Sequence, residues 1–297
     1  MRVFVTGATG FIGTAVVQEL INLGHEVLGL ARTEAAAQLL AAAGAHVHRG
    51  DLEDLESLKA GAAQTDGIIH TGFIHDFTRY VEMCEVDRRA IEAMGDVLAG
   101  TTKPFIVTSG TALLPSGKLA LESDTRAADN PNPRRTEEAA DAVAAKGVRI
   151  SVVRLPPSVH GEGDHGFVPI LINLARQKGV AVYQGDGSNI WPAVHRLDAA
   201  KLYRLALERN AEGGTRYHGV AERGIPFKDI AEVISKRLNV PIESRLDEEA
   251  EAYFEWFAHF AVLNNPSSSQ QTKEQLGWEP VNIGLIEDID SDYYFKA

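Results

Sequence analysis

Short apolar runs alternate with amphipathic stretches through the first half of the chain. Strand-like runs such as RVFVTG, HEVLGLA, GIIHTG, PFIVTSG and VRISVVRLP are separated by helix-like segments such as TAVVQELINLG and VEMCEVDRRAIEAMGDVLAG. Strands that alternate with helices of this length predict right-handed crossovers and a parallel sheet with helices on both faces. We therefore expect an α/β fold built on a doubly wound parallel sheet.

The pattern becomes less regular, and richer in glycine, proline and aromatic residues, from about Pro157 onward. We expect residues 1–156 to form the sheet domain, with further sheet elements from about 181–220. Residues 157–297 should form mostly a smaller α/β lobe and C-terminal helices, at the carboxyl edge of the sheet where such folds bind ligands. Glycines that follow four of the predicted helices should be left-handed C-caps. These are Gly24, Gly44, Gly100 and Gly147.

Composition narrows the classes of protein and partner. The 297 residues are 44% hydrophobic and carry a formal charge of -12, which disfavours a nucleic-acid partner. Neither a secretory leader pattern nor an apolar run of about 20 residues is present, so we expect a cytoplasmic protein without a membrane partner. The single cysteine, Cys84, is expected to be a small buried apolar residue. His46 and His48 share a strand face but lack the further ligands of a zinc site.

The segment VFVTGATGFIG, residues 3–13, is the strongest functional signal. A strand runs directly into Gly7, Gly10 and Gly13 and then into a helix. Such glycines allow a sharp turn, close approach of a pyrophosphate to the backbone, and close packing of helix on strand. The helix N-terminus offers amide donors to the phosphates. We predict a dinucleotide site that includes Gly7, Thr9, Gly10, Phe11, Ile12 and Gly13.

The second and third predicted strands bear on the choice of cofactor. HEVLGLAR ends in Arg32 and offers no carboxylate for a ribose 2′-hydroxyl, whereas an arginine can bind a 2′-phosphate. NADP is therefore favoured over NAD, with a merely solvated Arg32 as the alternative. In GDLED, Asp51 and Leu52 are expected beside the adenine. Asp51 can also serve as the N-cap of a helix that begins near Glu53.

These motifs, taken with HTGF, VTSG, VVRLPPSVHGEGD and LGWEP in this order, give a likeness that covers nearly the whole chain. The sequence resembles the extended short-chain dehydrogenase/reductase superfamily, the group of NAD-dependent epimerases and dehydratases with a Rossmann fold. The resemblance implies that His70, Thr71 and Gly72 run along the cofactor ribose. It also implies that the segment from Pro156 to Val159 borders the nicotinamide.

The family's chemistry uses a Ser or Thr hydroxyl, a Tyr, and a Lys four residues after the Tyr. Here Gly110 stands in the hydroxyl position, and the flanking Ser109 and Thr111 are the candidates to orient a carbonyl. In PNPRRTEEAAD, Arg134 replaces the tyrosine and Glu138 replaces the lysine. An arginine keeps its proton at physiological pH and cannot cycle as an acid and a base. We expect Arg134 and Arg135 to be solvated and paired with the acidic residues Glu137, Glu138 and Asp141, with stabilisation of an oxyanion as the alternative.

Other residues are left to supply a proton and to shape a substrate pocket. His75 and His165 are the candidate acids, because histidine titrates near neutrality. Trp191 stands where nucleotide-sugar members of the family carry a phosphate-binding arginine, which favours an apolar wall. We predict a substrate pocket lined by Phe73, Phe77, Phe167 and Trp191. The later aromatic cluster YFEWFAHF can add to this pocket, and the favoured alternative is that it packs within the smaller lobe or against a partner.

The sequence thus predicts an atypical NADP(H)-dependent reductase of a small, partly apolar ketone or aldehyde. A catalytically silent NADP-binding sensor is the alternative, because the Tyr–Lys pair is absent. A sugar-nucleotide epimerase or dehydratase is a third and weaker hypothesis. The expected partner is the carbonyl substrate, and a homodimer is left open.

Overall fold

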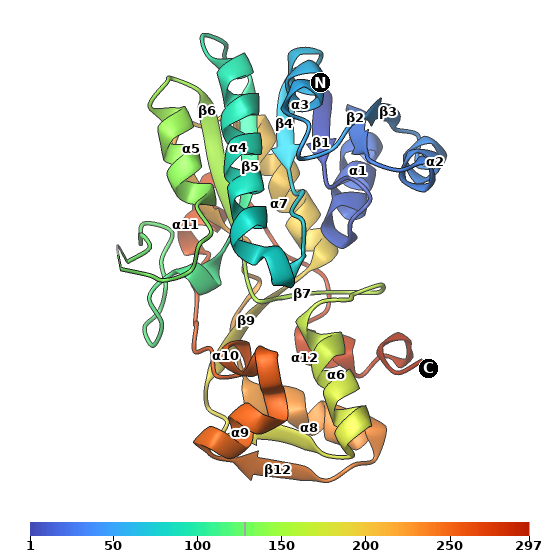
Figure 1. The fold of residues 1–297 in the computed structure, drawn as a ribbon, viewed down its shortest axis with the longest axis vertical. Coiled ribbons are helices and arrows are strands. Elements are labelled where there is room, and N and C mark those ends of the chain that lie inside the picture. The colour runs from blue at the N-terminus through green and yellow to red at the C-terminus, as the bar shows by residue number, and fades with distance from the viewer. Residues whose placement is uncertain (128, 297) are drawn as a thin grey trace.

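The computed structural model describes residues 1–127 and 129–296 and has two tiers (Figure 1). The upper tier is built on a seven-stranded sheet in the order β10-β6-β5-β4-β1-β2-β3, and every neighbouring pair is parallel. Its strands are β1 (Arg2–Thr6), β2 (Glu26–Ala31), β3 (His46–Arg49), β4 (Gly67–His70), β5 (Pro104–Gly110), β6 (Arg149–Leu155) and β10 (Thr215–His218). The predicted doubly wound parallel sheet is confirmed.

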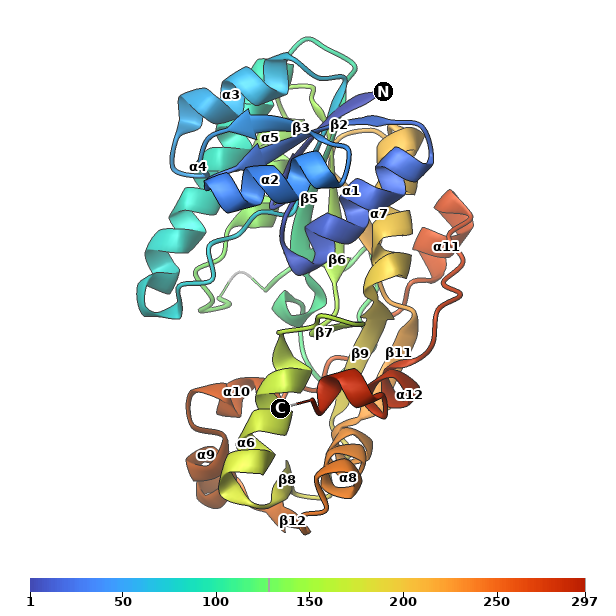
Figure 2. The same ribbon diagram turned by 90° about the vertical axis from the view of Figure 1, so that its right-hand side faces the viewer.

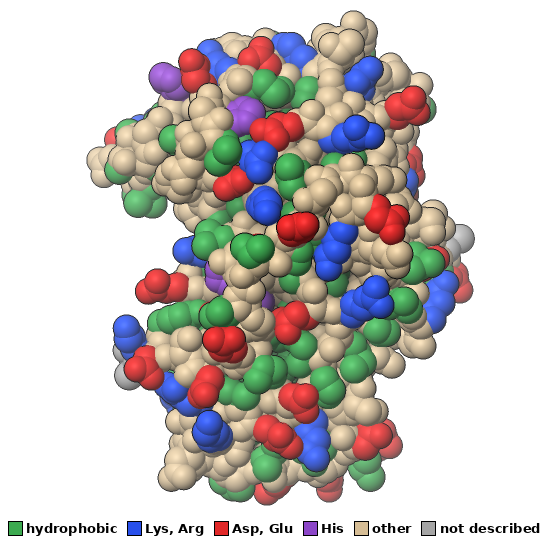
Figure 3. Space-filling view, turned by 180° about the vertical axis from the view of Figure 1, so that it is seen from behind, with side chains coloured by type: hydrophobic (Ala, Val, Ile, Leu, Met, Phe, Trp, Pro, Cys, Tyr) green, Lys and Arg blue, Asp and Glu red, His purple; other side chains and the backbone are tan. Residues whose placement is uncertain are grey.

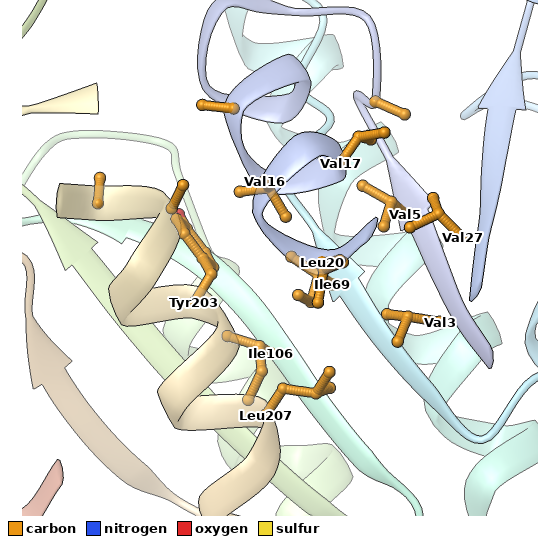
Figure 4. Close-up of a cluster of buried hydrophobic side chains, with 14 of the residues drawn as sticks. Val3, Val5, Val16, Val17, Leu20, Val27, Ile69, Ile106, Tyr203 and Leu207 are labelled. Carbon is orange, nitrogen blue, oxygen red and sulfur yellow. The ribbon is translucent and has the colours of Figure 1, made fainter. Parts of the chain in front are cut away.

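Helices cover both faces of this sheet (Figures 1 and 2). One face carries α1 (Phe11–Asn22), α2 (Glu34–Ala42) and α7 (Arg196–Arg209), and the other carries α3 (Leu55–Ala63), α4 (Tyr80–Leu98) and α5 (Thr136–Ala144). Alternate strand residues point to opposite faces, so Val3 and Val5 pack under α1 while Phe4 packs under α3. Figure 4 shows Val16, Val17 and Leu20 of α1 packed beside Tyr203 and Leu207 of α7.

The lower tier is a smaller mixed lobe. It contains a three-stranded sheet, β11-β9-β7, and a parallel pair, β12-β8. These strands are β7 (Ser158–His160), β8 (Ala181–Gln184), β9 (Ile190–His195), β11 (Glu222–Pro226) and β12 (Ile242–Arg245). Of the stretch 181–220, therefore, only β10 joins the large sheet, whereas β8 and β9 belong to the lobe.

The helices of the lobe enclose a second apolar core. They are α6 (Phe167–Lys178), α8 (Phe227–Leu238), α9 (Asp247–Phe254), α10 (Ala258–Ala261) and α12 (Leu285–Ile289). The helix α11 (Gln270–Leu276) instead packs beside α7 and β10 in the upper tier. Short 3-10 turns complete the set: η1 (Phe77–Arg79), η2 (Thr111–Leu113), η3 (Glu255–Phe257) and η4 (Asp292–Tyr294). Trp191 and Phe257 lie at the centre of this core with no exposed surface.

Local predictions about turns and about the cysteine agree with the structure. The four expected C-cap glycines all adopt positive φ, between 76° and 85°. Cys84 is buried in α4, and burial raises the pKa of its thiol.

The N-cap of α3 is Asp54, whose side chain accepts a hydrogen bond from Ser57 N, so the expectation that Asp51 caps this helix is wrong. Within the described residues, no helix is long and apolar enough to cross a membrane.

Candidate functional site

The turn from β1 into α1 has the geometry of a phosphate-binding loop. Gly7 adopts φ +66°, and a Cβ placed there would stand 2.6 Å from Gly72 N. A Cβ on Gly13 would stand 1.9 Å from the carbonyl oxygen of Gly7. Helix α1 begins after Gly10 without a side-chain cap, so its first amides are left for an anionic ligand.

A cleft of about 850 Å³ extends from this loop across the carboxyl edge of the sheet and onto the smaller lobe. Seen from behind, the surface is hollowed between the two tiers, with hydrophobic and histidine side chains at the hollow (Figure 3). The cleft brings together most of the residues that the sequence predicts for the cofactor: Gly7, Thr9, Gly10, Phe11, Ile12, Gly13, Arg32, Asp51, Leu52, Thr71, Gly72 and Val159. One continuous groove therefore joins the glycine loop to the ends of β2, β3, β4 and β7.

Arg32 and Asp51 lie together at one end of the cleft. The Nε of Arg32 is 3.7 Å from Oδ2 of Asp51, and the arginine side chain is 66% exposed. Asp51 Oδ1 accepts a hydrogen bond from Glu53 N at 3.0 Å, which fixes the carboxylate at the cleft. Thr33, the N-cap of α2, lines the cleft beside them. The guanidinium is therefore exposed at the cleft and loosely held.

Two residues predicted to touch the cofactor do not line the cleft. His70 is buried, with Nδ1 2.6 Å from Thr6 Oγ1 and Nε2 3.1 Å from Asp87 Oδ1. Its ring faces α4 rather than the ligand space, because it completes a buried polar network inside the sheet domain. Pro156 is buried as well, and Pro157 takes its place in the cleft wall. The structure therefore does not bring these two side chains into the cleft.

The hydroxyl candidates Ser109 and Thr111 lie outside the cleft lining as well. Ser109 Oγ donates to Glu137 Oε1 at 2.8 Å, and Thr111 Oγ1 donates to Asn265 Oδ1 at 2.7 Å. Both side chains are buried, and neither lines the cleft. Glu137 also binds the fully buried Arg154, through bonds of 2.8 and 2.7 Å. Ser109 therefore belongs to a buried ionic network and is not available to orient a carbonyl.

Arg134, which replaces the family's tyrosine, is partly buried rather than solvated. Its Nη2 donates to the carbonyl oxygen of Thr108 at 2.9 Å and its Nε donates to Thr136 Oγ1 at 3.0 Å. Its guanidinium stands 4.5 Å from the centroid of the Phe73 ring. The expected pairing with nearby acids holds for Arg135, whose Nε is 3.8 Å from Glu138 Oε1. Arg134 is instead a fixed positive charge behind an aromatic wall of the cleft.

Aromatic side chains from both tiers line the end of the cleft. Phe73, Phe77 and Phe167 lie there as predicted. Trp191 does not: it has no exposed surface, and it packs behind Phe167 with ring centroids 5.8 Å apart. Trp191 lies in β9, the central strand of the lobe's three-stranded sheet, and its indole points into the core of the lobe. Trp256, from the cluster YFEWFAHF for which the sequence leaves open both a pocket role and packing within the lobe, lines the cleft.

Three titratable side chains, His75, His165 and Asp164, line the cleft. Burial and the nearby charges of Arg134 and His165 lower the pKa of His75 below its usual value. His165 lies toward the glycine loop, with its ring centroid 5.8 Å from that of Phe11. Burial raises the pKa of Asp164, although its carboxylate accepts hydrogen bonds from Gly166 N and from a tyrosine hydroxyl. The lowered pKa keeps His75 mostly neutral at pH 7.

A buried network ties the C-terminal segment to this part of the cleft. Tyr294 donates to Asp164 Oδ2 at 3.0 Å, and Asp288 Oδ2 is 2.8 Å from His160 Nδ1. Tyr293 also donates to Asp288. Burial by itself would raise the pKa of Asp288, but the bonds from His160 and Tyr293 bring it below its usual value. The loop that carries Asp164 and His165 is therefore held in place by residues more than 120 positions away in the chain.

Several lining residues escaped the sequence analysis. They are Leu30, Thr33, Ala36, Gly50, Ile74, Asp76, Asp164, Gly166 and Ile170. A local signal existed for Thr33, since threonine before a helical stretch predicts an N-cap at the edge of the cleft. Asp76 could have been found in the same way, because its side chain caps η1. Of the aromatic cluster YFEWFAHF, Trp256 is the residue that lines the cleft, because the two tiers face each other, and no local pattern singles it out within the cluster.

Comparison with known proteins gives three consistent results. The model of the NAD dependent epimerase/dehydratase family matches residues 3–218. An uncharacterized protein of Schizosaccharomyces pombe is 52% identical over 297 residues, which cover 99% of this chain and 100% of the relative. A 4-hydroxy-2-methyl-3-oxo-4-farnesyl-3,4-dihydroquinoline-1-oxide ketoreductase of Stigmatella aurantiaca is 29% identical, over 72% of this chain and 66% of its own.

A solved structure gives the same fold. The UDP-glucose 4-epimerase of Thermus thermophilus, in complex with NAD, superimposes with a TM-score of 0.76 over 100% of both chains, at 20% identity. Identity this low is evidence for the fold alone. The residues of the cleft must therefore carry any argument about the reaction.

Proposed function

Because the chain belongs to the NAD dependent epimerase/dehydratase family, we propose that it is an NADP(H)-dependent reductase of a small, partly apolar ketone or aldehyde. The observation that carries the proposal is the continuous cleft, which runs from the glycine loop to an aromatic compartment that contains a titratable histidine. Such a groove can hold a dinucleotide and a carbonyl compound end to end.

The chain's own residues fit a nicotinamide dinucleotide. The uncapped first turn of α1 offers amides to the diphosphate, and any side chain at Gly7 or Gly13 would collide with backbone. Arg32, exposed at the cleft, suits a 2′-phosphate, which is why NADP(H) is preferred in the proposal. Bound nicotinamide supplies or accepts a hydride.

In the proposed reaction, His75 is the proton donor. It stands in the aromatic compartment, whereas His165 lies toward Phe11 and the phosphate end of the cleft. In this role the imidazolium of His75 donates its proton to the oxygen of the carbonyl as the carbonyl carbon is reduced, and solvent then reprotonates the ring. The fixed charge of Arg134, behind Phe73, favours negative charge developing on that oxygen.

The aromatic side chains exclude water and hold the carbonyl compound. Positioning of this kind can supply a large part of the rate without the missing Tyr–Lys pair. The ketoreductase among the relatives supports reduction of a carbonyl as the reaction class.

A second function, a catalytically silent NADP-binding sensor, is favoured by one observation. Arg134 and Glu138 occupy the places of the Tyr–Lys pair, and Ser109 and Thr111 are committed to buried hydrogen bonds. In that case the cleft would still bind the dinucleotide, but no carbonyl compound would be turned over. A sugar-nucleotide epimerase or dehydratase is supported less, because the helix that should carry the tyrosine and the lysine has neither.

The deciding experiment titrates purified protein with NADPH and with NADH, and then follows absorbance at 340 nm with a panel of ketones and aldehydes. The reductase proposal expects NADPH oxidation with at least one partly apolar carbonyl, and a rate at least tenfold lower in His75→Asn. Ser109→Ala is the matched control and should keep its turnover. Tight NADPH binding without oxidation by any panel member would favour the sensor.

A further inference from the structure

Two large aromatic side chains stand half exposed at the mouth of the cleft, one from each tier. Phe77, in η1, is 50% exposed, and Trp256, in η3, is 52% exposed. Their ring centroids are 5.6 Å apart, with the ring planes inclined by 35°. Both line the cleft. Apolar surface left open inside a concave site is the usual mark of a ligand contact.

Each ring is backed by others, so the two are presented in fixed positions. Tyr80 stacks behind Phe77 with centroids 5.9 Å apart and planes inclined by 28°. Phe257 supports Trp256 edge-on at 5.6 Å and is itself fully buried. Asp76 holds the turn that carries Phe77, by accepting hydrogen bonds from the amide and the hydroxyl of Thr78. Because these side chains are already ordered, binding a ligand here costs little conformational entropy.

The rings form a row that leads inward to the end of β4. From Trp256 and Phe77 the row continues to His75, 6.3 Å from Phe77, and then to Phe73, 5.2 Å from His75. The guanidinium of Arg134 lies 4.5 Å from the Phe73 ring. We call the four ring-bearing side chains, Trp256, Phe77, His75 and Phe73, the aromatic row. The proposed proton donor therefore stands inside the row, between the mouth and the cofactor-binding edge of the sheet.

We propose that the aromatic row binds a planar aromatic ring of the substrate, so that the chain's carbonyl compound is an aryl ketone or aryl aldehyde with its oxygen directed at His75. The inference rests on the proposed reductase function and names its substrate class. Centroids 5.6 Å apart leave no space for a third ring between Phe77 and Trp256, so the ligand ring lies against the cleft side of the row. A saturated ring of equal size is thicker and lacks the quadrupole that favours aromatic contacts, and should bind about three- to tenfold more weakly.

Intrinsic fluorescence tests the inference without turnover. Of the three tryptophans, Trp191 and Trp278 have no exposed surface, so acrylamide should quench mainly Trp256. With no nicotinamide present, 1-phenylethanol should protect Trp256 from acrylamide at a concentration about three- to tenfold lower than 1-cyclohexylethanol. Trp256→Phe should remove most of the quenchable signal, which assigns it. Equal protection by the two alcohols, or none by either, would overturn the inference.

Steady-state kinetics gives the second arm, with acetophenone compared with cyclohexyl methyl ketone. Phe77→Leu keeps an apolar side chain but removes the ring, and should raise KM about three- to tenfold for acetophenone while changing it less than about twofold for the saturated ketone. Val81→Ala, at a 70% exposed position of α4 outside the cleft lining, is the control and should change neither. Equal changes for both ketones in Phe77→Leu would overturn the inference.

The two arms separate the failure of the inference from the failure of the reductase function. Selective protection of Trp256 by 1-phenylethanol, with no ketone able to oxidise NADPH, would keep the aromatic site and reject the reductase. Turnover of ketones with no preference for aryl groups and no protection of Trp256 would keep the reductase and reject the aromatic site.

Discussion

At the scale of single residues, Arg32 decides the proposed choice between the two dinucleotides. Replacing it with Asp removes the cation that suits a 2′-phosphate and puts a carboxylate beside Asp51. Charge-assisted hydrogen bonds are worth about 1.5–3 kcal/mol, so NADPH should bind at least tenfold more weakly while NADH changes little. Fluorescence titration with both dinucleotides measures the effect. An equal loss of affinity for NADPH and NADH would contradict the assignment of Arg32.

His75 should give reduction a distinctive dependence on pH. Burial and the charges of Arg134 and His165 lower its pKa below 6.5, so the imidazolium is a minority form at pH 7. As the proton donor, it should make kcat/KM for ketone reduction rise as the pH falls through that lowered pKa. The acid-side rise should disappear in His75→Asn and persist in His165→Asn. A profile that is unchanged in His75→Asn would exclude the residue as the acid.

Glu137 should matter for stability rather than for catalysis. Burial would raise the pKa of its carboxyl, but the ion pair with Arg154 brings it below its usual value. In Glu137→Gln the fully buried guanidinium loses its counter-charge, so we expect a loss of about 3–5 kcal/mol in the free energy of unfolding. Glu138→Gln, one position along and half exposed, should cost less than about 1 kcal/mol. Urea unfolding of both variants checks the contrast, and equal losses would contradict it.

At the scale of elements, the contact between β1 and α1 should tolerate no side chain at Gly13. A Cβ there would stand 1.9 Å from the backbone of Gly7, so Gly13→Ala must push the helix off the strand. We expect it to abolish detectable NADPH binding and to lower the free energy of unfolding by several kcal/mol. Gly24→Asn is the control, because nothing lies within 4 Å of a Cβ there and asparagine tolerates its φ of +81°. Normal dinucleotide binding by Gly13→Ala would contradict the conclusion that the glycine loop can bind the dinucleotide only without a side chain at Gly13.

Elements that have a short-range sequence pattern could be predicted from the sequence. The positions of side chains that depend on contacts with distant residues could not. The glycine loop and the alternation of strands and helices are short-range patterns, and both agree with the structure. The side chain of Ser109 is held by Glu137, which also binds Arg154 of β6 and Arg216 of β10. No motif near Ser109 indicates these contacts with β6 and β10. The sequence alone therefore could not show that the Ser109 side chain points away from the cleft. The cluster that contains Trp256 is visible in the sequence, but which of its side chains faces the sheet domain depends on the same kind of distant contact.

At the scale of the whole molecule, the cleft joins the two tiers through a shared set of walls. Gly10 and Arg32 belong to the sheet domain, whereas His165, Phe167 and Trp256 belong to the lobe. The lobe is tied back to the cleft by the bond between Tyr294 and Asp164. Because each tier supplies part of one ligand site, ligand binding and the mutual placement of the tiers are thermodynamically linked.

Saturating NADPH should therefore stabilise the chain as one unit. At a concentration of about one hundred times Kd, binding to the folded state alone adds about 2.7 kcal/mol, which for a protein of this size raises Tm by roughly 4 °C. Scanning calorimetry should show one transition that moves as a whole, and Gly13→Ala should show no shift with NADPH. A pair of transitions of which only one responds would mean that the dinucleotide contacts the sheet domain without engaging the lobe. In that case the loop that carries Asp164 and His165 would play no part in holding the cofactor.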